Sequence, residues 1–79
     1  MRIDKYLKVS RIIKRRTLAS EACTAGRVSA NDKVVKASYE VKIGDIIEVR
    51  FGNSATKVEV LSLKESVKKE DSNLMYKVL

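Results

Sequence analysis

The chain has 79 residues, of which 44% are apolar and 34% are charged, and its formal net charge at pH 7 is +7. This length and composition predict one small globular domain with a thin core. Histidine is absent and cysteine occurs once, at Cys23. The usual general base at neutral pH and the usual ligands of a metal site are therefore missing. We expect no catalytic residue, no metal and no cofactor.

The positive charge is concentrated at the start of the sequence. The first sixteen residues contribute 7 − 1 = +6, and the remaining residues contribute only 10 − 9 = +1. One interpretation of this cluster is a phosphate-binding surface, because a phosphate backbone attracts localised positive charge. The alternative is charge that only keeps a small protein soluble, but such charge does not need to be localised. The pattern predicts a nucleic-acid interface that includes Arg2, Lys5, Lys8, Arg11, Lys14, Arg15 and Arg16.

Two short helices are expected before residue 26. At 100° per residue, one side of the first helix carries the apolar or small side chains Ile3, Tyr6, Leu7, Ser10 and Ile13. The opposite side carries Asp4, Lys5, Lys8 and Arg11. This helix should end near Ser10, because a longer one would turn Ile12 toward solvent. A second helix is expected over 16–25, with an apolar side of Leu18, Ala19, Ala22, Cys23 and Ala25, and Gly26 is placed to end it. Cys23 is interpreted as a small core residue.

After residue 26 the apolar pattern alternates, which is typical of strands. We expect strands over 27–30, 33–36, 46–51, 56–61 and 75–79, with turns at 31–32, 44–45 and 52–54. The segment 64–73 is polar and supports no prediction. We assign a structural role to four residues at the end of the second helix and in the turns, where the backbone needs a positive φ angle or a side chain that caps its own backbone. These residues are Gly26, Asn31, Gly44 and Asp45. The fold class is α+β, a helix pair followed by a small, mostly antiparallel sheet, in one domain over residues 1–79.

The order of several motifs resembles one known family. Over residues 1–51 the chain contains Arg2-Ile-Asp-Lys-Tyr-Leu-Lys8, Lys14-Arg15-Arg16, Gly26-Arg-Val28, Asn31 and Val41-Lys-Ile-Gly-Asp45. This order resembles the RNA-binding domain named after small-subunit ribosomal protein four. The resemblance implies a fold of the αL type, with two antiparallel helices on a small twisted sheet. Residues 52–79 would add the C-terminal strands and a polar loop.

The remaining positions narrow the resemblance to the stand-alone, heat shock protein fifteen-like members. Residues 9–19, 36–38, 49–52, 68–70 and 75–76 resemble the ribosome-associated quality control factor P group of Gram-positive bacteria. The resemblance implies binding to 23S rRNA and peptidyl-tRNA on stalled large ribosomal subunits. It also implies action with quality control factor H during alanine tailing of the nascent chain. We expect a cytoplasmic monomer without membrane association, since no apolar run could cross a bilayer and no signal-peptide pattern is present.

Within the family motif, Arg2 and Arg16 are the first candidates for RNA contact. Arg16 opens the second helix, where backbone N–H groups and a guanidinium fork both suit phosphate. The alternative for Arg16 is a salt bridge to Asp4, and the two roles are compatible. The other RNA-binding candidates are Arg11, Lys14 and Arg15 in the bend, Lys5 and Lys8 on the first helix, and Lys36 in the hairpin. Lys5 and Lys8 are equally consistent with ordinary solvated charge.

Arg15 departs from the family pattern, in which Ser or Thr often precedes the second helix. The helix thereby loses a capping side chain worth about 1 kcal/mol. A cation at this helix end is easier to explain if phosphate lies nearby.

The few aromatic residues favour recognition of RNA by shape and backbone, because no aromatic pair on a strand suggests a platform for stacked bases. Four alternatives remain open. The chain could be a small DNA-binding module of the helix-turn-helix kind, an RNA-binding factor for ribosome assembly or rRNA maturation, a modification enzyme, or an adaptor that holds factor H by protein contacts.

Overall fold

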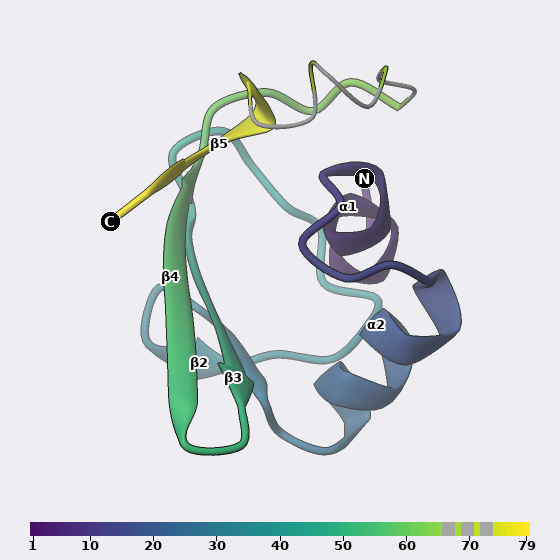
Figure 1. Cartoon of the computed structure of the whole chain (residues 1–79), viewed down its shortest axis with the longest axis vertical. Helices are drawn as coiled ribbons and strands as arrows, with labels where there is room; N and C mark the ends of the chain where they lie inside the picture. Colours follow the sequence, from purple (N-terminus) through teal and green to yellow (C-terminus); the bar gives the residue numbers. More distant parts are fainter. Residues whose placement is uncertain (66–67, 69–70, 72–73) are drawn as a thin grey trace.

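The computed structural model describes residues 1–65, 68, 71 and 74–79. Two helices precede five strands within these residues, and Figure 1 shows how they are arranged. The elements are α1 (Ile3–Val9), α2 (Arg16–Thr24), β1 (Val28–Ala30), β2 (Lys33–Val34), β3 (Ile46–Phe51), β4 (Ser54–Val60) and β5 (Tyr76–Val78). The predicted α+β fold is confirmed. The polar segment 64–73, and part of the 68–70 motif within it, fall largely outside the described residues.

The strands form one sheet in the order β2-β1-β3-β4-β5, and each neighbouring pair is antiparallel. Register places Val28 opposite Val49 and Ile47 opposite Val58, so these buried side chains share the face that the helices cover. The other face pairs opposite charges across strands, as Glu48↔Lys57 and Glu59↔Lys77. The sheet therefore has one core face and one solvated face whose charges are matched.

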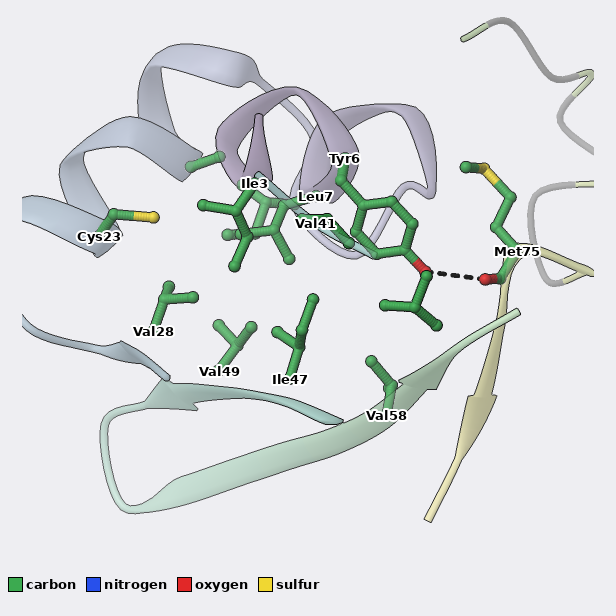
Figure 2. Close-up of a cluster of buried hydrophobic side chains, with 13 residues drawn as sticks. Ile3, Tyr6, Leu7, Cys23, Val28, Val41, Ile47, Val49, Val58 and Met75 are labelled. Atoms are coloured by element: carbon green, nitrogen blue, oxygen red, sulfur yellow. Dashed lines mark hydrogen bonds between the residues drawn. The ribbon is translucent and has the colours of Figure 1, made fainter. Parts of the chain in front are cut away.

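The core lies between α1, α2 and the sheet, as Figure 2 shows. Ile3, Tyr6 and Leu7 of α1 are fully buried, which confirms the predicted apolar side of this helix. The Tyr6 hydroxyl donates to the Met75 carbonyl at 2.8 Å and so joins the start of β5 to α1. Burial, and to a lesser extent Tyr76, raises the pKa of Tyr6 above its ordinary value. Cys23 of α2 is buried as predicted, and burial raises the pKa of its thiol.

Three details of the helices and strands differ from the sequence prediction. Asp4 is 3% exposed, although the helical pattern placed it on the solvent side, because α2 covers that part of α1. Leu18 and Ala25 are exposed, so the apolar side of α2 is narrower than predicted. Strand boundaries also differ: β2 ends at Val34, two residues earlier than expected, and β4 begins at Ser54, which the sequence placed in a turn. Of the helices in the described part of the chain, none is long and apolar enough to cross a membrane.

The turns are fixed by residues that the sequence assigned to architecture. Gly26 has a φ of 76° after α2, and Asn31 and Asp32 have φ of 52° and 69° between β1 and β2. Asn31 Nδ2 donates to Asp45 Oδ1 at 3.1 Å, and Asn31 Oδ1 accepts from the Ile46 amide at 3.0 Å. These bonds fasten the β1–β2 turn to the start of β3.

Asp45 also joins the loop that follows β2. Asp45 Oδ2 accepts from the Tyr39 hydroxyl at 2.8 Å and from the Lys42 amide at 2.9 Å. Burial disfavours the charged carboxylate, but the bonds from Lys42, Asn31 and Tyr39 outweigh that effect and hold the pKa of Asp45 below its usual value. The charged form of Asp45 is thus the one that the fold stabilises.

We expect this carboxylate to make stability fall in acid. Its folded pKa is depressed, so its contribution is complete above the unfolded pKa of about 3.9 and is lost as the pH falls through the lower folded value. Thermal unfolding of the wild type and Asp45→Asn from about pH 2 to 7 measures this contribution. The variant should be less stable at neutral pH, and the difference between the two proteins should shrink in acid. A difference that stays constant over this range would contradict the assignment.

Candidate nucleic-acid interface

The first three residues are held in place by the segment 39–41. The Ile3 amide donates to the Tyr39 carbonyl at 2.8 Å, and the Val41 amide donates to the Met1 carbonyl at 2.9 Å. The terminal ammonium of Met1 pairs with Glu40 Oε2 at 2.9 Å. These contacts fix the backbone at Arg2 immediately before α1. Nothing local in the sequence indicated the role of Glu40, because it pairs with a residue 39 positions away.

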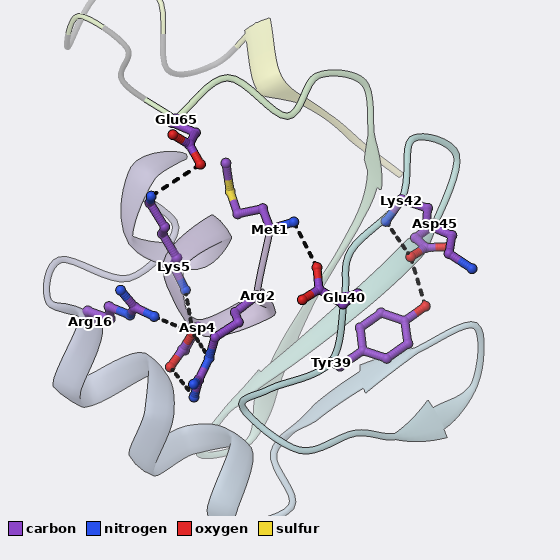
Figure 3. A network of polar contacts seen from close by, with 10 residues as sticks. All are labelled: Met1, Arg2, Asp4, Lys5, Arg16, Tyr39, Glu40, Lys42, Asp45 and Glu65. Carbon is purple, nitrogen blue, oxygen red and sulfur yellow. Dashed lines mark hydrogen bonds and ion pairs between the residues drawn. The ribbon is translucent and has the colours of Figure 1, made fainter.

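Asp4 joins the two arginines that the sequence ranked first, as Figure 3 shows. Arg2 donates from Nε to Oδ1 at 3.3 Å and from Nη2 to Oδ2 at 3.2 Å. Arg16 Nη2 donates to Oδ1 at 3.4 Å, and the Lys5 amide donates to the same oxygen at 2.7 Å. A buried carboxylate thus holds Arg2, from before α1, beside Arg16, from the first residue of α2.

The two guanidinium groups are only partly engaged by this carboxylate. The Arg2 side chain is 47% exposed and the Arg16 side chain is 49% exposed, whereas the Asp4 side chain is 4% exposed. Because a guanidinium carries five N–H donors, both arginines have donors beyond those on Asp4. Arg16 therefore forms the salt bridge to Asp4 that the sequence offered as its alternative role, and it still has donors with which to bind a further anion.

The bend between the helices presents three more cations. Arg11, Lys14 and Arg15 are exposed, and none of them forms an ion pair with the described residues. Arg11 has a φ of 64°, a conformation that costs a non-glycine residue about 1–2 kcal/mol. Arg15 is the N-cap of α2 and makes no side-chain capping hydrogen bond. The bend thus carries a high positive charge, together with a strained backbone at Arg11 and no capping side chain at Arg15.

The remaining candidates are divided between two regions. Arg2 and Lys36 line the same open groove, of about 640 Å³, between the end of α2 and the segment 34–38. Lys8 is exposed on α1. Lys5 instead turns toward Glu65, with a distance of 3.5 Å from Nζ to Oε1, as Figure 3 shows. The structure therefore places Arg2 beside Arg16 at Asp4 and places Arg2 along one groove with Lys36, whereas it directs Lys5 elsewhere.

The chain matches a known protein family over the segment that carries these residues. Residues 1–47 match the S4 domain family, a match that spans more than half of the chain. The chain belongs to the S4 domain family. The matched part contains α1, the bend, α2 and the segment that holds Arg2 in place, so it includes every RNA-binding candidate named from the sequence.

Relatives are similar over nearly their whole length. The chain is 52% identical to the "RQC P-site tRNA stabilizing factor" of Streptococcus pneumoniae, over 100% of this chain and 90% of the relative. It is 53% identical to the protein of the same name from Bacillus subtilis, over 100% and 92%. The family resemblance seen in the sequence is therefore confirmed.

A solved structure supports the same fold. The trimeric structure of Vibrio cholerae heat shock protein 15 matches with a TM-score of 0.92 at 26% identity, over 100% of this chain and 81% of the other. The two-helix and antiparallel-sheet architecture is therefore shared with the heat shock protein fifteen-like group.

Proposed function

We propose that this protein binds RNA on the large ribosomal subunit and stabilises tRNA in the P site during ribosome-associated quality control. The contact that carries this proposal is the Asp4-centred pair of Arg2 and Arg16. The pair presents two guanidinium forks from one rigid base, and such forks match the geometry of phosphate oxygens. The name of the S. pneumoniae and B. subtilis relatives supports P-site tRNA as the target.

The interface in this proposal consists of Arg2, Arg16 and Lys36, extended by Arg11, Lys14 and Arg15 of the bend and by Lys8. Asp4 positions the two arginines and does not itself contact RNA. Lys5 is a weaker candidate because Glu65 lies beside it. The charge-matched outer face of the sheet is not part of the interface, since its lysines lie opposite glutamates and its field is locally neutral.

Our finer proposal follows the resemblance seen in the sequence. The protein contacts 23S rRNA and peptidyl-tRNA on a stalled large subunit in the cytoplasm, and it acts there as a monomer beside quality control factor H. It supports alanine tailing by holding the tRNA and has no catalytic activity of its own. The absence of histidine agrees with a binding role, because histidine is the side chain that most often serves as a general base at neutral pH.

Co-sedimentation with purified large subunits, across a salt series, tests the RNA contact. If about five phosphates are neutralised, the logarithm of the binding constant should fall with the logarithm of salt concentration with a slope of roughly −3 to −5. A slope near zero would contradict phosphate binding and would favour an adaptor held by protein contacts.

The same assay with and without peptidyl-tRNA tests the tRNA contact. We expect tighter binding to occupied subunits, because the proposed interface contacts both RNAs there. Equal binding to empty and occupied subunits would contradict the tRNA role and would favour a factor for subunit assembly. Duplex DNA is the competitor control, and it should displace the protein poorly.

A further inference from the structure

A second open groove, of about 410 Å³, lies between α2 and the end of β3. Ile13, Leu18 and Phe51 provide its large apolar side chains. Leu18 is 48% exposed and Phe51 is 46% exposed. In Figure 1 the end of β3 and α2 lie toward the same end of the molecule. Two large apolar side chains that border one groove form a continuous surface, which differs from scattered exposure of single residues.

The sheet register explains why Phe51 is exposed. Val49 and Phe51 are two residues apart on β3, so they point to the same face of the sheet. Val49 is 1% exposed beneath the helices, whereas Phe51 reaches past them and lies opposite Ser54. The groove is thus an extension of the core face that no other described segment covers.

The charges at the rim of this groove are mainly positive. Arg27 and Arg50 line it together with one acid, Glu21. The Arg50 amide donates to the Arg27 carbonyl at 2.9 Å, so backbone pairing sets the two arginines side by side. Arg50 alternates with Val49 and Phe51 along β3, so its side chain starts from the other face of the strand. It is 65% exposed at the rim, and its Nε lies 3.8 Å from Glu48 Oε1.

The groove is also continuous with the cationic bend. Ile13 forms part of its wall, and Lys14 and Arg15 follow directly in the sequence. A ligand that contacts the bend and continues past α2 would therefore meet the groove next. Arg27 forms no ion pair with the described residues, and an apolar peptide in the groove would leave it without one, whereas a nucleotide offers both a base face and a phosphate.

We propose that this groove binds one unpaired nucleotide of the RNA that the protein contacts. The base stacks on Phe51 with Leu18 at its edge, and the flanking phosphates meet Arg27 and Arg50. The inference rests on the proposed function, since it assumes an RNA partner, and it adds a second contact with an unstacked base. Backbone recognition at the Arg2–Arg16 pair then has a neighbouring site that requires single-stranded RNA.

Substitutions at Phe51 test the stacking contact on large subunits that carry peptidyl-tRNA. Phe51→Leu keeps an apolar side chain but removes the aromatic face, and we expect binding to weaken about tenfold. Phe51→Trp keeps the face and should bind at least as tightly as the wild type. Ile43→Ala is the control, because Ile43 is 67% exposed and does not line the groove. Thermal unfolding of each variant verifies that it is folded.

A photo-reactive benzoylphenylalanine at position 51 identifies what occupies the groove. We expect it to cross-link to RNA in the same complexes, and a cross-link to a ribosomal protein instead would overturn the proposal. Equal binding of Phe51→Leu and the wild type would overturn it as well. If Arg16→Glu still abolishes binding in that case, the proposed function stands and only the groove assignment is wrong. If the wild type itself fails to bind subunits, the proposed function and the groove assignment both fall.

Discussion

Reversing the charge at Arg16, with Arg16→Glu, is expected to weaken binding to large ribosomal subunits by about a hundredfold or more. A charge-assisted hydrogen bond contributes about 1.5–3 kcal/mol, and the new carboxylate would also repel phosphate and share its site with Asp4. The dependence on salt should become shallower, by about one unit of slope. Co-sedimentation at several salt concentrations measures both effects.

Two further variants separate a specific contact from a general loss of charge. Lys77→Glu makes the same change in net charge on β5, at the far edge of the sheet, and should alter binding little. Arg16→Lys keeps the charge but loses the planar fork, so an intermediate loss is expected. If Lys77→Glu weakened binding as much as Arg16→Glu, the protein would be responding to net charge alone.

Loss of side-chain volume at Leu7 should have the largest effect on folding. Leu7 is fully buried between the sheet and the helices, and Leu7→Ala should lower the free energy of unfolding by about 2–5 kcal/mol. A domain of 79 residues has only about 4–12 kcal/mol of stability in total. The melting temperature should therefore fall by roughly 10–40 °C in a thermal denaturation experiment.

The matched control for this experiment is the same substitution at an exposed site. Leu61 is 46% exposed, so Leu61→Ala should change the free energy of unfolding much less than Leu7→Ala. At temperatures well below its melting point, Leu7→Ala should still bind subunits, because its side chain lies in the core and not at the interface. A melting temperature equal to that of the wild type would show that α1 does not pack as described.

Much of the fold follows from local patterns in the sequence. The helical spacing from Ile3 to Leu7 predicted the buried side of α1, and Gly26 and the Asn31-Asp32 turn have the positive φ angles that their residue types favour. The alternation over 46–51 matches β3. These features were predictable because each depends on neighbours within a few residues.

The features that depend on distant contacts were not predictable in the same way. A helical projection assumes that a helix has one buried apolar side and one solvent-exposed polar side, and it placed Asp4 on the exposed side. In the fold α1 is covered by both the sheet and α2, so Asp4 is buried. The ion pair of the Met1 ammonium with Glu40 and the exposure of Leu18 likewise depend on how elements meet in space. The sequence placed the cations in one segment, and only the fold relates Lys36 to Arg2.

The bend between α1 and α2 limits how this protein can be engineered for heat resistance. A redesign for thermostability would first replace Arg11, whose backbone conformation suits glycine, and Arg15, whose N-cap position suits serine or aspartate. Each replacement would remove one of the exposed cations that the proposed interface uses. In the proposed interface, stability and RNA affinity therefore compete for the same two positions, and a more stable version of this domain would have to gain its extra stability elsewhere.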